Sequence, residues 1–330
     1  MIPLLKKFPA VFASGLVGAS LLWAAPTQAQ TLKLGHVTPP THVWHQVATK
    51  IDEQLQAKSD GKMKVDVNPL SKLGSEAQMV NLLQSGALPL GIITLGSLSN
   101  REPSLDGWVM PYLFDDVADA AQATQSDASK KMLSNLEAQG LIGVGYAFAG
   151  MRHVLSTKPI KQPADLKGQK VRAFPGAIYN DWWTGNGAAP TAMPLSEVAP
   201  SLTTNLLNAV DIDLDAVVGM KFHQQAPYLT LTNHMAFPGV IVISKRYWDR
   251  LDEEQQSQLM EAINEAQEWG FELAAAADKQ NLETVRADGA EVIEVDLEPF
   301  KAIGAKVNQK YIDSNEIIAQ FYQEVQDAKN

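Results

Sequence analysis

The chain has 330 residues, of which 45% are hydrophobic and 19% are charged, and it contains no cysteine. This length and composition suffice for a packed core and favour two lobes over one. The lack of disulfides is neutral about the compartment, and a chain without cysteine is compatible with an oxidising one. The formal net charge of −10 argues against nucleic acid or an anionic membrane surface as a partner. It leaves anionic ligands open, because buried arginines can override the mean charge.

Residues 1–29 have the pattern of a secretory signal peptide. Lys6 and Lys7 form a basic start, an apolar run follows, and small residues offer a cleavage site near Ala29. A membrane anchor is the alternative, but the apolar run is short and contains Gly and Pro. Cleavage would remove Lys6 and Lys7, leaving 25 basic and 37 acidic residues and a net charge of −12. We therefore predict that the mature protein is periplasmic.

The first part of the mature chain alternates between strand and helix patterns. Alternating apolar residues predict strands over 31–35, 62–68 and 88–95, and apolar residues at helical spacing predict helices over 43–58 and 75–86. This order predicts parallel strands joined by right-handed crossovers.

The remaining elements complete a two-lobe arrangement, with lobe one over 30–149 plus 241–280 and lobe two over 150–240 plus 281–330. Residues 297–330 are expected to be mostly helical. In chain order we predict an irregular aromatic segment (97–114), a helix (119–139), a strand (141–147), a returning strand (235–244), a long helix (252–285), a strand (290–295) and a closing helix (308–322). At 1.5 Å per residue the long helix would measure roughly 50 Å, enough to run along both lobes.

Arg172 stands in a short strand pattern among apolar neighbours. The turn signal Asp165-Leu-Lys-Gly168 precedes the strand Lys170-Val-Arg-Ala-Phe174. If the sheet is covered on both faces, the guanidinium needs an anion, and its fork matches a carboxylate bidentately. A ligand carboxylate is one interpretation; an internal acidic partner, or an arginine that snorkels at the strand end, is the other.

The motifs around this strand resemble the solute-binding receptors of TRAP (tripartite ATP-independent periplasmic) transporters, of the dicarboxylate-receptor type. After the Asp-Leu-Lys-Gly turn and the Lys-Val-Arg strand come Gly187-Ala-Ala-Pro-Thr191 and the Glu197-Val198 pair at the start of a helical run to Leu207. Leu-Gly-Ser-Glu over 73–76 and Gly150-Met-Arg152 also match, so that the resemblance covers nearly all of the mature chain. The family's Asp-Gly-x-Glu-Asn is replaced here by Asp211-Ile-Asp213-Leu-Asp215.

The resemblance implies an α/β two-lobe periplasmic binding protein fold with parallel-type sheets, a cleft between the lobes and a long helix spanning both. It implies capture of a small organic acid by an Arg–carboxylate clamp formed by Arg172 and Arg152, and delivery to the membrane subunits of a TRAP transporter. We expect no cofactor, no nucleic-acid partner and a monomer. A sensing subunit that reports to a membrane kinase is an alternative.

An enzyme is the remaining class. A lyase or isomerase acting on an organic acid would use the acid cluster Asp211, Asp213 and Asp215 beside the arginines. The sequence has no nucleophile-elbow, dinucleotide, phosphate-loop or zinc-protease motif. We therefore expect a receptor and no enzyme.

Other residues are candidates for the ligand site. Trp182 and Trp183 are adjacent, and one is expected to face the cleft unless both belong to the core. Glu76 accepts ligand hydroxyl hydrogens or favours a helix N-terminus. Asp213 and Asp215 share one side of an extended chain and would read hydroxyls, an ammonium or a cation, unless they cap a helix or form a hinge salt bridge.

Three histidines follow the first strand. His36 ends that strand, at the position that faces the cleft in this architecture. A metal cluster of His36, His42 and His45 would have no further acidic or Cys ligand, so we predict no metal site.

The acids near the site also bear on the ligand. Asp215 stands where relatives have a neutral Asn, and a second ligand carboxylate there would meet like charge. We predict a monocarboxylate with an apolar or ring body, covered by Trp182 and Trp183, over a simple diacid.

Overall fold

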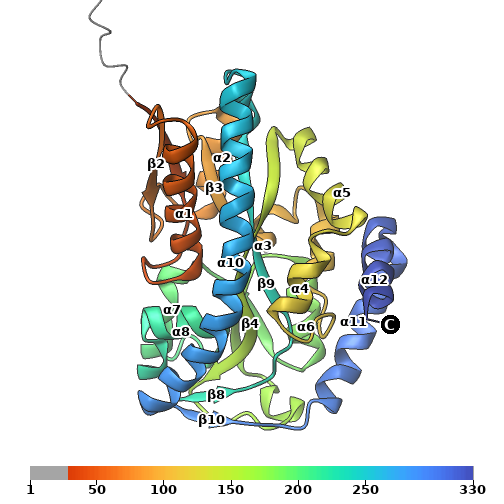
Figure 1. Ribbon diagram of the computed structural model, residues 1–330. Coiled ribbons are helices and arrows are strands. Elements are labelled where there is room, and N and C mark those ends of the chain that lie inside the picture. Colours follow the sequence, from red (N-terminus) through yellow and green to blue (C-terminus); the bar gives the residue numbers. More distant parts are fainter. Residues whose placement is uncertain (1–28, 330) are drawn as a thin grey trace, which may run out of the picture.

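The computed structural model describes residues 29–329, so the predicted signal peptide lies outside the described residues except for Ala29. The described chain is an α/β protein in which helices flank one ten-stranded sheet (Figure 1). Among its helices, none is both long and apolar enough to cross a membrane.

The sheet follows the order β2-β1-β3-β9-β4-β7-β5-β6, and β8 joins β10 to β4 beside this path. The strands are β1 (Gln30–Gly35), β2 (Met63–Asn68), β3 (Leu90–Thr94), β4 (Leu141–Ser156), β5 (Lys170–Ala173), β6 (Ala189–Ala192), β7 (Ala209–Asp213), β8 (Tyr228–Thr230), β9 (Ala236–Ser244) and β10 (Glu291–Ile293).

The α-helices are α1 (Val43–Lys58), α2 (Glu76–Ser85), α3 (Leu95–Leu98), α4 (Val117–Ala123), α5 (Asp127–Asn135), α6 (Ala177–Gly185), α7 (Val198–Thr203), α8 (Leu214–Met220), α9 (Lys245–Trp248), α10 (Glu253–Ala287), α11 (Glu298–Ser314) and α12 (Glu316–Ala328). Short 3₁₀ turns complete the chain: η1 (Pro103–Val109), η2 (Leu136–Gln139), η3 (Pro163–Leu166), η4 (Leu195–Glu197) and η5 (Phe222–Gln224).

The predicted opening of the chain is confirmed. β1 pairs in parallel with both β2 and β3, and β5 pairs in parallel with β6 and β7. β9, which returns from the second half of the chain, lies antiparallel between β3 and β4. The sheet is therefore mixed, with parallel strands on both sides of an antiparallel centre.

β4 connects the two halves of the sheet. It pairs with β9 as far as Met151, and from Arg152 onward it pairs with β7. The pairing register with β9 shifts between Phe148 and Met151, and Gly150 has φ of 117°, which residues with a side chain adopt only under strain. The expected strand over 141–147 thus continues through this irregularity. The lobe bounds given above stay a prediction.

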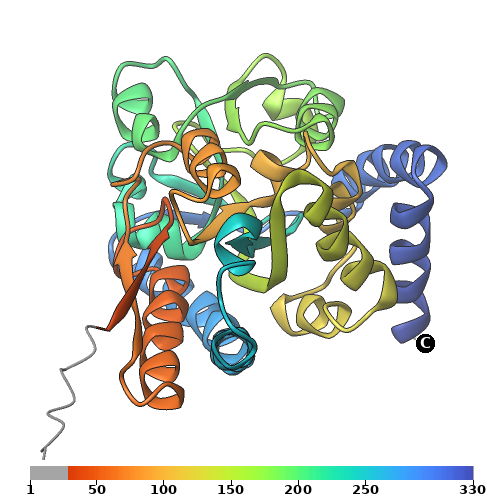
Figure 2. The same cartoon turned by 90° about the horizontal axis from the view of Figure 1, so that it is seen from above.

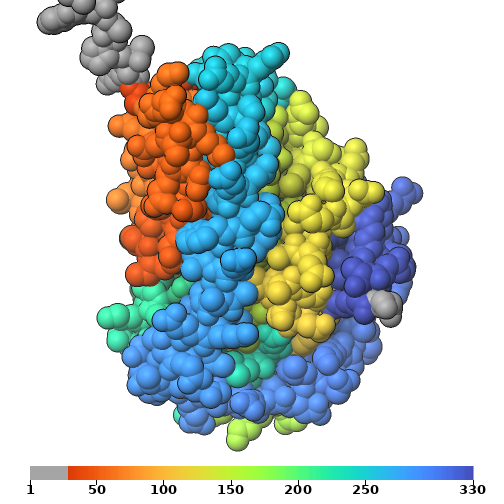
Figure 3. All heavy atoms as spheres, viewed as in Figure 1, coloured from red at the N-terminus to blue at the C-terminus, as the bar shows by residue number. Residues whose placement is uncertain are grey.

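The long helix α10 is confirmed. Its 35 residues correspond to about 52 Å, and it begins with a capping box in which Asp252 and Gln255 satisfy each other's backbone N–H groups. α10 packs against α1, β4 and α8; Figure 2 shows it end-on beside α1, and Figure 3 shows it running along one face of the molecule. At Gly270 an added Cβ would lie 2.6 Å from Val47, so the glycine permits the close approach of α1.

Three expected helices have different bounds. The helix expected over 119–139 is divided into α4, α5 and η2. The run expected to reach Leu207 ends at Thr203, and Asn205 adopts a left-handed φ of 56°. The closing helix expected over 308–322 is wrong, because Asn315 is extended and separates α11 from α12. The side chain of Asn315 accepts hydrogen bonds from the first N–H groups of α12, so this residue begins a new helix.

Asp278 of α10 lies against the irregular part of β4. One of its carboxylate oxygens is buried without a hydrogen-bond partner, and it would lie 2.7 Å from a Cβ added to Gly150. Burial, reinforced by the negative charges of Asp213, Asp215 and Asp116, raises the pKa of Asp278 to about 7, although the backbone N–H of Met151 acts in the opposite direction.

We expect Asp278→Asn to stabilise the protein at pH 8 and to have little effect at pH 4. Because the folded pKa exceeds the unfolded value, the native state binds the extra proton, and stability falls as pH rises from about 4 to about 7. The side chain is only partly buried as a whole, so we expect a gain of about 1–2 kcal/mol at pH 8. Urea unfolding across this pH range measures it.

The matched control is Asp66→Asn, which changes an exposed carboxylate on β2. An equal pH dependence of unfolding in the parent and the Asp278 variant would contradict the assignment.

Candidate functional site

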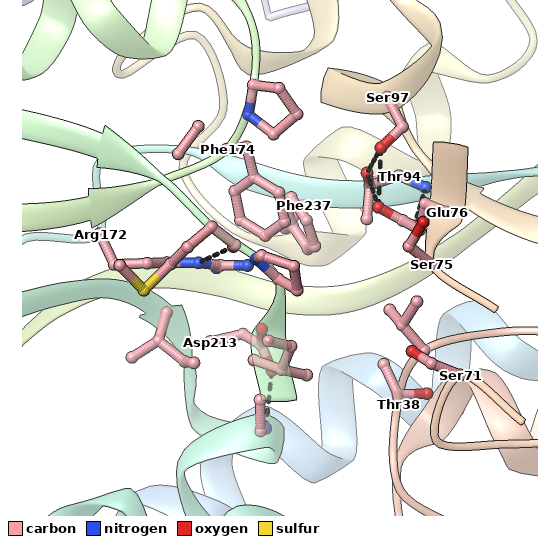
Figure 4. Close-up of a pocket in the computed structure, with 18 of the residues that line it drawn as sticks. Thr38, Ser71, Ser75, Glu76, Thr94, Ser97, Arg172, Phe174, Asp213 and Phe237 are labelled. Carbon is pink, nitrogen blue, oxygen red and sulfur yellow. Dashed lines mark hydrogen bonds between the residues drawn. The ribbon is translucent and has the colours of Figure 1, made fainter. Parts of the chain in front are cut away.

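A cavity of about 320 Å³ lies between the two halves of the sheet (Figure 4). One wall comes from the loop after β1, the start of α2 and the β3–α3 junction, and the other from the ends of β5, β6 and β7. The lining residues are Val37, Thr38, His42, Trp44, Ser71, Ser75, Glu76, Ala77, Thr94, Ser97, Arg152, Arg172, Phe174, Pro175, Ala192, Met193, Pro194, Leu195, Ile212, Asp213, Ala216 and Phe237.

Arg172 projects from β5 into this cavity and is only 3% exposed. Its Nε donates to the carbonyl of Met193 at 3.1 Å, and its guanidinium lies 4.1 Å over the ring of Phe174. Nη1 is buried without a hydrogen-bond partner. Among the described residues no carboxylate lies within the 4.0 Å ion-pair distance of this guanidinium.

The surroundings of Arg172 are electrostatically unfavourable to its charge. Burial, together with the neighbouring charge of Arg152, lowers the pKa of Arg172 to about 10, although Asp211, Glu76 and Asp213 act in the opposite direction. A dry cation with an unused donor has the chemistry to bind an anion.

Arg152 also lines the cavity, but its donors are largely used within the protein. On β4, its Nε donates to Asp211 at 2.5 Å, its Nη1 donates to Asp213 at 2.9 Å, and its Nη2 donates to the carbonyl of Asp211. Its guanidinium lies 4.3 Å from the ring centre of Phe237. Arg152, which the resemblance assigns to the clamp, is therefore engaged in salt bridges within the protein.

Asp211 is the fully buried centre of this network. It accepts a hydrogen bond from Trp183 Nε1 at 3.1 Å, and His234 Nε2 lies 3.6 Å away. Burial by itself would raise the pKa of Asp211, but the charges of Arg152 and His234 hold that pKa below its usual value. Asp211 supports the site from behind, because it is not among the lining residues.

Asp213 and Asp215 have partners inside the protein. Asp213 lines the cavity, pairs with Arg152 and accepts the N–H of Ala216 at 2.8 Å, which caps α8. Asp215 accepts the N–H of Val43 at 2.7 Å and a hydrogen bond from Asn281 at 3.2 Å, and it is not a lining residue. Of the alternatives left open for this pair, the helix cap is present at Asp213, and Asp215 accepts hydrogen bonds from α1 and α10.

Glu76 begins α2 and faces the cavity across from Arg172 (Figure 4). Its carboxylate accepts the backbone N–H of Thr94 at 2.8 Å, the Thr94 hydroxyl at 2.7 Å and the Ser97 hydroxyl at 2.8 Å. Burial raises the pKa of Glu76, and these three donors and the charge of Arg172 oppose that rise.

The two tryptophans of α6 are buried away from the cavity. Trp182 stacks on His234, with ring centres 5.6 Å apart, and Trp183 Nε1 donates to Asp211. Neither ring lines the cavity, because both point from α6 into the core. The aromatic surfaces of the site come instead from Phe174 and Phe237, whose ring centres lie 4.6 Å apart.

His36 is also buried outside the lining. Its ring nitrogens lie 2.9 Å from the Thr38 hydroxyl and 3.1 Å from His45 Nδ1. Within residues 29–329, no group of three or more His, Cys, Asp or Glu side chains could hold a metal ion. His42 lines the cavity, 3.5 Å from Asp213.

Several lining residues were missed by sequence reasoning. Phe174 was visible in the Arg172 strand, yet nothing marked it as a contact of both arginines. Phe237 comes from β9, far away in sequence, and no local pattern joins it to this site. Thr94 ends the buried strand β3 and Ser97 lies in α3 directly after it; polar residues at the carboxyl end of a buried strand are a signal that could have identified them.

The comparisons with known proteins agree with this architecture. A family model described as bacterial extracellular solute-binding protein, family 7, matches residues 34–315. The 2,3-diketo-L-gulonate-binding periplasmic protein YiaO of Escherichia coli K12 is 29% identical over 306 residues, covering 92% of each chain.

Solved structures give the same relationship. A TRAP periplasmic solute-binding protein from Bradyrhizobium, in complex with galacturonate, has a TM-score of 0.86 at 27% identity, covering 90% of this chain and 100% of that one. One from Haemophilus influenzae with bound L-gulonate has a TM-score of 0.85 at 25% identity, covering 91% and 99%. One from Shewanella oneidensis with bound succinate, at 22% identity and a TM-score of 0.85 over 90% and 99%, shows the shared fold alone.

The family match covers most of the chain, the fold is that of two-lobe binding proteins, and the cavity lies between the two halves of the sheet. This chain therefore belongs to family 7 of the bacterial extracellular solute-binding proteins, the solute-binding proteins of TRAP transporters.

Proposed function

We propose that this protein captures a small organic acid in the cavity between β5 and α2 and delivers it to the membrane subunits of a TRAP transporter. The observation that carries the proposal is Arg172, a buried guanidinium with an unused donor at the cavity and no carboxylate partner among the described residues. A ligand carboxylate supplies the missing anion and accepts bidentate hydrogen bonds.

The relatives support the class of ligand. Their descriptions name 2,3-diketo-L-gulonate, L-gulonate and galacturonate, all acids with one carboxylate. Others name four-carbon dicarboxylates. These descriptions cover both kinds of acid and so do not support the predicted preference for monocarboxylates. Nor does the original basis of that preference survive, because Asp213 and Asp215 bind protein groups.

Arg152 has a different role in this proposal. Its ion pairs with Asp211 and Asp213 hold β4 and β7 together and fix the wall from which Arg172 projects. Its remaining N–H hydrogens can assist Arg172, since Arg152 also lines the cavity. We infer that the ligand contacts both walls, because only a ligand that binds the closed state better shifts the balance toward closure.

The same proposal makes the protein a receptor and no enzyme. It includes secretion with cleavage near Ala29, in keeping with the periplasmic location of the family. Mass spectrometry of ligand retained after mild purification would identify the natural acid, and that acid should raise the melting temperature by mass action.

We expect Arg172→Lys to weaken binding of the retained acid by about 2–5 kcal/mol, because lysine keeps the charge but loses the two-pronged contact. Calorimetric titration of parent and variant measures the loss. The fold should survive, since Arg172 has no ion pair to lose. Equal affinity in the two proteins would show that Arg172 is not the anchor.

We expect Arg152→Lys, unlike Arg172→Lys, to destabilise the folded protein. This variant leaves Asp211 and Asp213 poorly compensated in a dry interior and should lower the free energy of unfolding by about 3 kcal/mol. Urea unfolding of the two lysine variants side by side measures the difference. Similar losses of stability in both would contradict the separation of roles.

A further inference from the structure

Glu76, Thr94 and Ser97 form a closed hydrogen-bonded group on the cavity wall opposite Arg172 (Figure 4). The two hydroxyl oxygens lie 2.7 and 2.8 Å from the same carboxylate oxygen, and 3.1 Å from each other. The other carboxylate oxygen accepts the Thr94 N–H.

The number of side-chain hydrogens shows whether this group offers a ligand hydrogen-bond donors or acceptors. A hydroxyl has one hydrogen and two lone pairs. With Glu76 ionised, both hydroxyl hydrogens point at its carboxylate. With Glu76 protonated, its own hydrogen goes to Thr94, that of Thr94 goes to Ser97, and that of Ser97 returns to Glu76. In either state every side-chain hydrogen is used inside the group, so only lone pairs face the cavity.

The charges at the cavity favour a ligand with a single carboxylate. Within the described chain, the lining residues carry two arginines, Arg152 and Arg172, and two carboxylates, Glu76 and Asp213. Arg152 is already paired, which leaves Arg172 as the cation open to a ligand. A second ligand carboxylate reaching Glu76 would bring like charge into a desolvated space and would find no donor in the group.

We propose that the Glu76–Thr94–Ser97 group selects hydroxy acids, with the ligand carboxylate on Arg172 and a ligand hydroxyl donating to the group, and rejects diacids of the same length. The inference rests on the proposed function, because it requires a carboxylate on Arg172. Glu76 acts as a specificity-determining residue that accepts hydrogen bonds and orients its two neighbours.

A competing feature on the same wall makes the test decisive. Ser71 and Ser75 also line the cavity, as do Glu76 and Ala77 in the first turn of α2, where backbone N–H groups could serve an anion. If these donors dominate, a diacid will bind as well as a hydroxy acid.

The test uses pairs of acids that differ in one terminal group. L-Gulonate and D-glucarate share one carbon chain and differ by a terminal hydroxyl or carboxylate, and 4-hydroxybutyrate and succinate form the shorter pair. Calorimetric titration of the mature protein at pH 8 should give at least tenfold tighter binding of the hydroxy acid in any pair that binds. A diacid that binds equally or more tightly would overturn the inference.

Glu76→Gln reverses the hydrogen-bond polarity at constant size. The amide oxygen keeps the Thr94 N–H, while the amide NH₂ donates to the two hydroxyls, so that at least one hydroxyl hydrogen loses its acceptor in the group and can point toward the cavity. The ratio of the diacid's dissociation constant to that of the hydroxy acid should fall at least tenfold. Glu272→Gln, an exposed change on α10, should leave the preference intact. An unchanged preference in Glu76→Gln would overturn the proposal.

A second variant keeps the test valid if Glu76→Gln does not fold. Ser97→Ala removes one acceptor from the group, and it should weaken binding of the hydroxy acid several-fold with little effect on the diacid. Equal losses for both acids would count against the proposal. Arg172→Lys tests the proposed function separately from the selectivity. Loss of binding of every acid in this variant supports Arg172 as the carboxylate anchor, whichever of hydroxy acid and diacid the parent prefers. If the parent binds no organic acid, the proposed function fails and this inference fails with it.

Discussion

The ion pairs of Arg152 with Asp211 and Asp213 are the interaction on which the site depends. They join β4 to β7 at the point where β4 leaves β9, and they do so in a fully buried environment. Such a network contributes little net stability over an apolar replacement, but removing one member leaves an uncompensated charge. Its consequence is that both aspartates are paired with Arg152, while Arg172 retains an unused donor.

The two arginines therefore differ in their contacts, and the proposed function gives them different roles. Arg152 holds the wall together, and Arg172 presents an unpaired guanidinium against Phe174. An unpaired buried cation is costly, and an anion that paired with it would relieve that cost, so that binding and stability would be linked. Across the cavity, Glu76 accepts the hydroxyl hydrogens of Thr94 and Ser97. One wall thus offers hydrogen-bond donors and the other offers acceptors.

The same region is where α10 contacts several other elements. α10 lies along β4 and α8, and Asp278 contacts β4 at Gly150, where the strand changes partners. Asn281, one turn further along α10, donates to Asp215, which also accepts the N–H of Val43 at the start of α1. Contacts from α1, α8 and α10 thus meet near this point.

The sequence by itself determined the elements whose signals are local. The opening strands and helices, the β5 strand around Arg172 and the long α10 follow from periodicity and caps, and the motifs around Arg172 sufficed for the family. Some bounds were wrong, because Asn315 adopts an extended backbone within a helical pattern.

Tertiary structure alone decided which charges pair. Asp211, Asp213 and Asp215 are equivalent by type and spacing, but β-sheet register assigns the first two to Arg152, while the approach of α1 and α10 assigns the third to Val43 and Asn281. The burial of Trp182 and Trp183 and the arrival of Phe237 from β9 depend likewise on contacts between residues far apart in the chain, which no local pattern encodes.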